Sequence, residues 1–144
     1  MPDDAPIPMP FDPLAAGWKP MRGMDGYPAL IGPFLARRTG ESWQYGFLAE
    51  PRHLNKGGVV HGGMLMSFAD DALGMTVWEA AGRRNCTTVQ LNTQFVAPVR
   101  AGEFVESRAE VLRRTRSLIF VRGMLAVGDR TVIHADGIWK ILGA

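Results

Sequence analysis

Residues 55–74 contain the groups best suited to chemistry, because they run from a glycine-rich loop into an apolar helix with two carboxylates. A helix N-terminus presents unpaired backbone N–H groups and a partial positive charge. Gly62 and Gly63 at this end have no side chains, so a ligand oxygen can approach these donors and a carbonyl can be polarised there. We expect a site at which this helix end acts together with an acid.

The candidate acids lie in a polar stripe on the same helix. Ser67, Asp70, Asp71 and Gly74 recur at i, i+3, i+4 and i+7, whereas nearly every other residue in 64–81 is apolar, as in a helix surrounded by protein. A carboxylate on such a helix is costly unless it is paired or used. Neighbouring residues lie about 100° apart around a helix axis, so the two acids cannot aim at one point. We expect one to be catalytic and the other structural.

The spacing between the helix end and the acid predicts an assembly. Asp70 follows Gly62 by eight residues, which corresponds to about 12 Å along a helix that rises about 1.5 Å per residue. This distance is too long for both groups of one chain to act on the same substrate atom. If they cooperate, the helix end of one subunit must face the acid of another, as a two-fold dimer allows.

The composition predicts one domain in a reducing compartment. The chain has 144 residues with 47% hydrophobic content, a formal net charge of +2 and a single cysteine, Cys86, so an internal disulfide is excluded. No basic run is interleaved with aromatic residues, so nucleic-acid binding is not expected. No apolar stretch reaches about 18 residues and no secretory signal is recognisable. We therefore expect a cytoplasmic protein without a membrane interaction.

The sequence divides into a proline-rich arm over residues 1–20 and a single domain over residues 21–144. Prolines in the arm exclude a regular helix or a central strand there. Strands are expected over residues 27–38, 42–49, 86–96, 104–112, 117–127 and 131–142, and a helix over residues 62–81 that ends at Gly82. Short turns favour antiparallel pairing. The expected fold is α+β, with one long helix wrapped by a curved antiparallel sheet.

Several of these elements together resemble a known family. The pattern is Asn55-x5-His61-Gly62-Gly63, then Asp70, then Thr88-Val89-Gln90-Leu91-Asn92 and Phe95-Val96-Ala97-Pro98. It resembles the hot-dog-fold acyl-CoA thioesterases of the phenylacetate-pathway type, relatives of 4-hydroxybenzoyl-CoA thioesterase. The resemblance covers about residues 40–142 and implies a hot-dog fold, an acyl-CoA substrate, no cofactor, and a homodimer with shared sites that pairs into a tetramer.

The resemblance also implies roles for single residues. The backbone N–H of Gly62 and the side chain of Asn55 would hold the thioester carbonyl oxygen as oxyanion donors. Asp70 of the opposite subunit would activate water as general base or attack the carbonyl itself. The hydroxyl of Thr88, where the family more often has serine, would orient the water. His61 belongs to the same matched pattern and is kept as a catalytic candidate.

Each of these residues also has a simpler interpretation. Asn55 could cap a turn, and His61 could brace the loop through a ring hydrogen bond, which we prefer to a catalytic part. Asp70 could belong with Asp71 to a solvated pair at a dimer rim, and ordinary β-propensity explains Thr88 equally well. Asp71 is left to a supporting or interface role.

Further candidates concern substrate binding. Gly63 adjoins the helix end, and Arg113, Arg114 and Arg116 fall in the expected turn between two strands, where they could bind the phosphates of coenzyme A. Arg100 is another candidate of this kind, and a solvated hairpin tip is the alternative for the arginines. The three histidines show no paired ligand spacing, so no metal site is expected.

The sequence thus predicts an acyl-CoA thioesterase, with aryl-acyl-CoA among its candidate substrates. A hot-dog enoyl-CoA hydratase or dehydratase is one alternative, although the spacing of His61 and Asp70 does not match the expected hydratase motif. A non-catalytic acyl-CoA-binding regulator is another, because a fold does not fix a function. A purely structural dimer would neither bind nor turn over a thioester.

Overall fold

The computed structural model describes residues 10–144 as one helix-and-sheet domain with a short N-terminal strand. In chain order the elements are β1 (Lys19–Pro20), α1 (Tyr27–Ile31), β2 (Leu35–Thr39), β3 (Ser42–Leu48), the 3-10 helix η1 (Pro51–His53), α2 (Gly62–Ala80), β4 (Cys86–Phe95), β5 (Phe104–Arg114), β6 (Leu118–Val127) and β7 (Arg130–Ile141). No helix in these residues is long and apolar enough to span a membrane.

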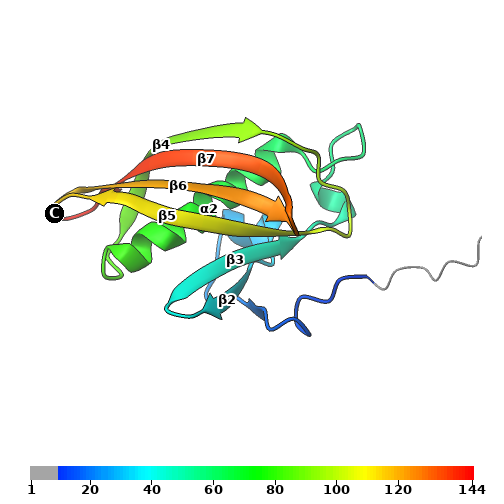
Figure 1. Ribbon diagram of the computed structural model, residues 1–144, viewed down its shortest axis with the longest axis horizontal. Coiled ribbons are helices and arrows are strands. Elements are labelled where there is room, and N and C mark those ends of the chain that lie inside the picture. Colours follow the sequence, from blue (N-terminus) through cyan, green and yellow to red (C-terminus); the bar gives the residue numbers. More distant parts are fainter. Residues whose placement is uncertain (1–9) are drawn as a thin grey trace, which may run out of the picture.

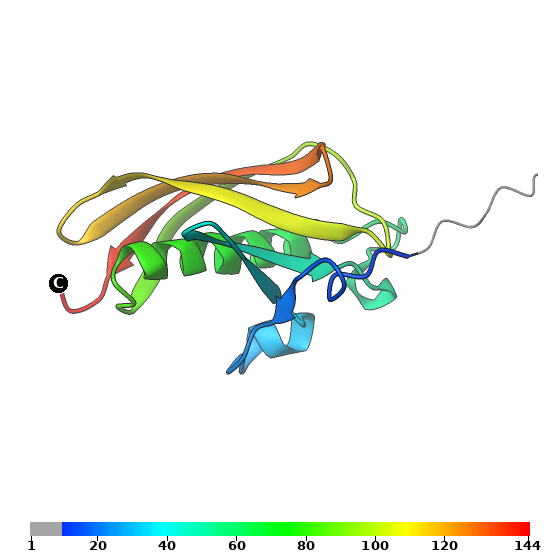
Figure 2. The same ribbon diagram turned by 60° about the horizontal axis from the view of Figure 1, so that its bottom comes forward.

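The strands form one antiparallel sheet in the order β1-β2-β3-β5-β6-β7-β4. β4 follows α2 in the chain but lies at the end of the sheet next to β7 (Figure 1). The sheet curves over α2, which lies along its inner face (Figure 2). The expected α+β architecture, a long helix wrapped by a curved antiparallel sheet in the hot-dog fold, is confirmed.

The core forms between α2 and the inner face of the sheet. In β7 the alternation of side chains buries Ala135, Trp139 and Ile141 against the helix and exposes Asp136 and Lys140 between them. The helix contributes one buried face, made of Met64, Leu65, Phe68, Ala69, Ala72, Leu73 and Val77. The sheet therefore covers one side of α2 and leaves the polar stripe of the helix partly accessible within one chain.

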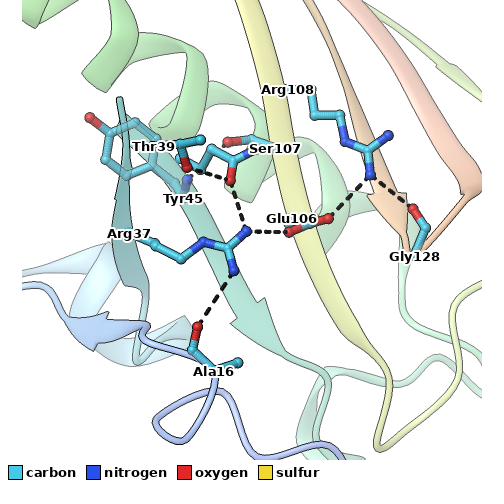
Figure 3. A network of polar contacts seen from close by, with 9 residues as sticks. Ala16, Arg37, Thr39, Tyr45, Glu106, Ser107, Arg108 and Gly128 are labelled. Carbon is cyan, nitrogen blue, oxygen red and sulfur yellow. Dashed lines mark hydrogen bonds and ion pairs between the residues drawn. The ribbon is translucent and has the colours of Figure 1, made fainter. Parts of the chain in front are cut away.

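A network of charged side chains joins the N-terminal segment to the sheet (Figure 3). The guanidinium of Arg37 on β2 donates to the backbone oxygen of Ala16 at 3.5 Å and lies 3.8 Å from Glu106 on β5. Arg108 in turn donates to Glu106 at 3.2 Å and to the backbone oxygen of Gly128 at 3.0 Å. Because these contacts tie segments far apart in sequence, they fix the start of the domain against β2, β5 and the β6–β7 turn.

The prediction of a strand over residues 27–38 is wrong for the first part of this range. Tyr27–Ile31 forms the short helix α1, and β2 begins only at Leu35. Pro28 lies in the first turn of α1, where its fixed φ and missing N–H suit a helix. The other expected strands and the long helix are confirmed, with each boundary within two residues of the structure.

The proposed boundary between an arm over residues 1–20 and a domain over residues 21–144 stays a prediction, and residues 1–9 lie outside the described residues. At the end of this arm Trp18 is buried, with its ring 4.9 Å from the ring of Phe104. Lys19–Pro20 pair with β2. The described end of the arm therefore packs on the body of the protein.

Candidate active site

The start of α2 is fixed by His61. The Nδ1 atom of His61 accepts a hydrogen bond from the backbone N–H of Gly63 at 2.8 Å. The backbone N–H of His61 donates to the backbone oxygen of His53 at 2.8 Å. A Cβ at Gly63 would lie 2.9 Å from His61 Nδ1, so the close approach requires glycine. The His61 side chain, which we expected to brace this loop, therefore caps α2 by accepting the hydrogen bond of the Gly63 N–H.

Gly62 supplies the remaining donor at this helix end. Its backbone N–H makes no hydrogen bond within residues 10–144, and it lies in the first turn, where intrahelical acceptors are lacking. A Cβ at Gly62 would lie 3.3 Å from two ring carbons of Phe95, so the aromatic ring stands beside the open donor. Phe95 is half exposed on β4. The helix end thus offers one unpaired N–H next to an accessible ring.

The Asn55 side chain is oriented by the loop that precedes α2. Its Oδ1 accepts from the backbone N–H groups of Gly57 at 2.8 Å and Val59 at 3.3 Å. These two donors assign the amide oxygen to the loop and leave the Nδ2 group free of hydrogen bonds within the described part of the chain. The turn-capping interpretation of Asn55 therefore holds in the structure, and the same contact leaves an amide N–H₂ as a second available donor.

The acid and the hydroxyl of the candidate site meet within one chain. Thr88 Oγ1 on β4 donates a hydrogen bond of 2.7 Å to Asp70 Oδ1 on α2. Both residues line a groove of about 490 Å³ between α2, β4 and the segment at residues 21–24. A carboxylate with one oxygen held by a hydroxyl keeps its other oxygen for a water or a substrate.

Asp71 lies on the wall between this groove and a second cavity. The second cavity has a volume of about 360 Å³, and its lining is mainly apolar, with Met21, Met24, Phe34, Tyr45, Phe68 and Met75. Asp71 lines both spaces and is half-buried. Burial, and secondly the negative charge of Asp70, raise the pKa of Asp71 to about 6. The two acids therefore differ in their surroundings: Asp70 accepts a hydrogen bond from a hydroxyl, whereas Asp71 borders a mainly apolar cavity.

A single chain forms two half-sites rather than one complete site. We define the donor half-site as Asn55 and Gly62 and the acid half-site as Asp70 and Thr88. Gly62 and Asp70 lie on one continuous helix, so their eight-residue separation corresponds to about 12 Å along its axis. The structure thus pairs Asp70 with Thr88 but does not bring this pair to the donor half-site of the same chain.

The candidate arginines are distributed between two places. Arg114 donates from Nη1 to the backbone oxygen of Ala80 at 2.6 Å, so it lies at the C-terminal end of α2, and Arg113 and Arg116 are exposed on the same hairpin. Arg100 lies instead near the N-terminal end of α2, because the neighbouring Val99 accepts a hydrogen bond of 2.7 Å from the backbone of Val60. The four arginines of one chain therefore do not form one cluster.

Two further residues, Tyr27 and Trp139, lie at the site, and the sequence did not single them out. The Tyr27 hydroxyl lies 2.8 Å from Ser67 Oγ. Because Ser67 donates its own proton to the backbone oxygen of Gly63 at 2.8 Å, Tyr27 is the donor to Ser67. Trp139 lines the same groove as Asp70. Tyr27 was missed because residues 27–38 were expected to form a strand. Trp139 was missed because its position depends on the β4–β7 register, which the local sequence does not specify.

No group of three or more His, Cys, Asp or Glu side chains within residues 10–144 has the arrangement of a metal site. The groups present at the two half-sites are a carboxylate, a hydroxyl and N–H donors. Such groups can position a water and stabilise charge that develops on a carbonyl oxygen.

The fold defines a hot-dog protein, and the two half-sites lie within the part of the sequence that carries the family pattern. The chain belongs to the thioesterase superfamily, whose family model matches residues 57–134. The expected relationship to thioesterases of the phenylacetate group is confirmed.

Individual relatives extend over most of the chain. The provisionally named esterase PA0474 of Pseudomonas aeruginosa is 28% identical over 127 residues, which are 87% of this chain and 95% of the relative. The structure of conserved protein PA5202 from Pseudomonas aeruginosa has a TM-score of 0.76 and 26% identity, and covers 83% of this chain and 95% of its own. A provisionally assigned thioesterase of Ralstonia eutropha JMP134, described as phenylacetic acid degradation-related, is 30% identical with a TM-score of 0.71 and the same two coverages.

Proposed function

We propose that this protein is an acyl-CoA thioesterase that hydrolyses the thioester to a free acid and coenzyme A. The observation that carries the proposal is the 2.7 Å hydrogen bond from Thr88 to Asp70, because it places an oriented carboxylate in an accessible groove. Membership of the thioesterase superfamily supports the same reaction class. The open N–H of Gly62 supplies a donor of the kind that acyl transfer needs.

The proposed reaction uses one acid half-site and one donor half-site. Asp70 takes a proton from water while the water oxygen forms a bond to the thioester carbon, and Thr88 holds the carboxylate in place. The carbonyl oxygen accepts hydrogen bonds from the partner subunit's Gly62 and from the partner subunit's Asn55, which stabilise its negative charge. The carbon–sulfur bond then breaks, and the proton passes from Asp70 to the sulfur. No cofactor enters this sequence.

Two subunits are required in this scheme because the half-sites of one chain are separated. β4, which carries Thr88, pairs with β7 on one side and has no neighbouring strand among the described residues on the other. Val89, Phe95 and Val96 on and after this strand are more than half exposed. An open strand edge with apolar side chains favours pairing with another chain. We therefore propose a homodimer with β4 at the two-fold interface; the tetramer and the cytoplasmic location remain predictions.

The acyl group fits the smaller cavity in this proposal. This cavity has a volume of about 360 Å³ and is lined by aromatic and methionine side chains, which suit an aryl or medium-length acyl chain. The acyl chain would enter past Asp71. The Ralstonia relative is described as related to phenylacetic acid degradation. We therefore propose aryl-acyl-CoA thioesters as the preferred substrates.

The test is thiol release from aryl-acyl, short-chain and long-chain CoA thioesters. The wild-type protein should hydrolyse aryl-acyl-CoA, and Asp70→Asn should lower the rate by about 10² to 10⁴, the usual contribution of general acid–base catalysis. Asp129→Asn in the exposed β6–β7 turn is the matched control and should retain activity.

Three results would contradict the proposal. Tight binding of acyl-CoA without turnover by the wild-type protein would indicate a regulator. Hydration of an enoyl-CoA without thiol release would indicate a hydratase. Full activity of Asp70→Asn would remove this carboxylate from the mechanism.

A further inference from the structure

The groove that holds Asp70 and Thr88 continues along α2 toward the C-terminal end of the helix. Its lining passes Gly74 and Trp78 and reaches Asn85 and Cys86. Asp70 and Trp78 are eight residues apart on the helix, so this part of the groove is about 12 Å long. The space is therefore an elongated channel that begins at the acid half-site.

Positive charge lies at the far end of this channel. The Cys86 thiol donates to the backbone oxygen of Arg84 at 3.3 Å, and the guanidinium of Arg114 binds the backbone of Ala80. Burial raises the pKa of the Cys86 thiol, whereas the charges of Arg84 and Arg114 oppose this rise, so both guanidinium groups act at this end of the groove. An anionic group would be favoured there.

Trp139 presents a hydrogen-bond donor along the way. Its side chain is 2% exposed, and it lies directly opposite Thr88 in the β4–β7 register, so the two side chains share the inner face of the sheet. A Cβ at Gly74 would have Trp139 Nε1 as its only neighbour within 4 Å, at 3.6 Å. The small residue thus leaves the indole edge open to the groove.

No fully buried side-chain nitrogen or oxygen of the described residues lacks a hydrogen-bond partner. The indole N–H of Trp139, which has no partner among these residues, is therefore reached from the groove that Trp139 lines. An indole N–H can only donate, so a ligand in the groove binds to it through an acceptor. An acceptor on a bound ligand can take the place of the water that this N–H otherwise meets in the groove.

We propose that the indole N–H of Trp139 donates a hydrogen bond to an amide carbonyl of the pantetheine arm, which lies in this groove between the thioester at Asp70 and the coenzyme A phosphates at Arg84 and Arg114. This inference rests on the proposed thioesterase function. Trp139 acts as a binding residue for the thiol part of the substrate and takes no part in the reaction at the carbonyl.

The position along the helix selects this acceptor. Gly74 lies one helical turn beyond Asp70, about 6 Å along the axis. The thioester oxygen is held by the donor half-site, and an apolar acyl group enters the smaller cavity, so neither supplies an acceptor at Trp139. The pantetheine arm carries two amides, and the first is only a few bonds from the sulfur. A carbonyl at this distance from the reacting carbon therefore meets the Trp139 N–H.

The test compares thioesters that share one acyl group and differ in their thiol. Acyl-CoA and acyl-N-acetylcysteamine contain the amide, whereas an acyl thioester of 1-butanethiol does not. Trp139→Phe keeps an aromatic ring but removes the N–H. We expect kcat/KM to fall roughly three- to tenfold for the two amide-containing thioesters, as for loss of one neutral hydrogen bond, and to stay unchanged for the butanethiol ester. Trp43→Phe, half exposed on β3, is the control and should change none of the three.

A structural role of Trp139 would lower kcat/KM equally for all three thioesters, and this result would overturn the proposal, as would no change for any of them. Should Trp139→Phe fail to fold, benzothienylalanine at position 139 replaces the N–H by sulfur in a ring of the same shape and gives the same comparison. If the wild-type protein hydrolyses no thioester, the proposed function itself fails instead.

The arginine end of the groove has its own readout. Arg84→Gln should raise KM for acyl-CoA severalfold, and it should leave KM for acyl-N-acetylcysteamine unchanged because that thioester carries no phosphate. The increase should diminish at high salt, because salt screens the contact in the wild-type protein. An equal change in KM for both thioesters, or no change for acyl-CoA, would contradict the assignment of this end to the phosphates.

Discussion

Replacing Asp71 by asparagine removes a carboxyl group whose pKa rises from 3.8 to about 6 on folding, through burial and the nearby charge of Asp70. A shift of about 2 pKa units corresponds to about 3 kcal/mol at 1.36 kcal/mol per unit. Because the side chain is only half-buried, solvent screening reduces the expected effect to about 1 kcal/mol. Asp71→Asn should therefore increase the free energy of unfolding at neutral pH.

The sign follows from the two protonation equilibria. At pH values below about 4 the carboxyl is protonated in both the folded and the unfolded state, so it imposes no penalty on folding. Between about pH 4 and pH 6 the carboxyl is ionised in the unfolded state but still protonated in the folded state, so the wild-type protein loses stability as the pH rises through this range up to the folded-state pKa of about 6. The advantage of Asp71→Asn should therefore appear between about pH 4 and pH 6 and remain constant above this range.

The assay is urea unfolding across this pH range at one protein concentration, because oligomerisation makes apparent stability depend on concentration. Asp129→Asn in the exposed turn is the control and should stay within about 0.5 kcal/mol of the wild type. A variant at Asp71 that is less stable at about pH 8, or an advantage that is equal at every pH, would refute the account of this carboxyl.

Three other substitutions test separate contacts. Thr88→Val removes the hydrogen bond to Asp70 and should lower thioester hydrolysis at least tenfold, about the effect of 1.4 kcal/mol, whereas Thr88→Ser should retain most of the rate; equal rates in a thiol-release assay would contradict this role. His61→Ala removes the cap on Gly63 and should lower the free energy of unfolding in urea by about 1 kcal/mol; unchanged stability would mean that the cap contributes nothing. Leu73→Ala opens a cavity in the core and should lower the unfolding midpoint by an amount equivalent to about 3 kcal/mol; a loss below about 1 kcal/mol would indicate that the core collapses around the site.

Local sequence patterns were sufficient to predict most of the fold. α2 could be placed because its apolar run, the two glycines at its start and Gly82 at its end are local signals. The later strands could be placed because they are rich in β-branched and apolar residues, and because turn residues at Pro98–Gly102 and Gly128–Asp129 separate two pairs of them. These signals depend on residues that are neighbours in the chain.

α1 could not be predicted because its contacts come from distant residues. Arg52 donates to the backbone oxygens of Leu30 and Gly32, and His53 Nε2 lies 2.7 Å from the backbone oxygen of Ile31. These partners follow the carbonyls by 20 to 22 residues, beyond β2 and β3. Nothing in residues 27–38 themselves indicates that their carbonyls have such partners. Tertiary contacts override a local strand pattern here.

The candidate site was predictable only in part for the same reason. The polar stripe on α2 indicates from spacing alone that one of Asp70 and Asp71 is catalytic. The assignment of Asp70 and the participation of Thr88 were expected only through the family resemblance, and the hydrogen bond between the two was not expected. The groove and Trp139 depend on the register that sets β7 against β4. A one-residue change in that register would turn Trp139 to the other face of the sheet, so the sequence could not place its indole beside the acid.

Subunit complementation tests whether one active site combines residues of two subunits. Two differently tagged variants, Asp70→Asn and Asn55→Ala, are produced separately and together, and dimers with both tags are isolated. Each variant alone should hydrolyse acyl-CoA poorly. A mixed dimer contains one site with both substitutions and one intact site, so it should recover about half of the wild-type rate per dimer. A mixed dimer as inactive as its parents would show that each site is built within a single chain and would contradict the account.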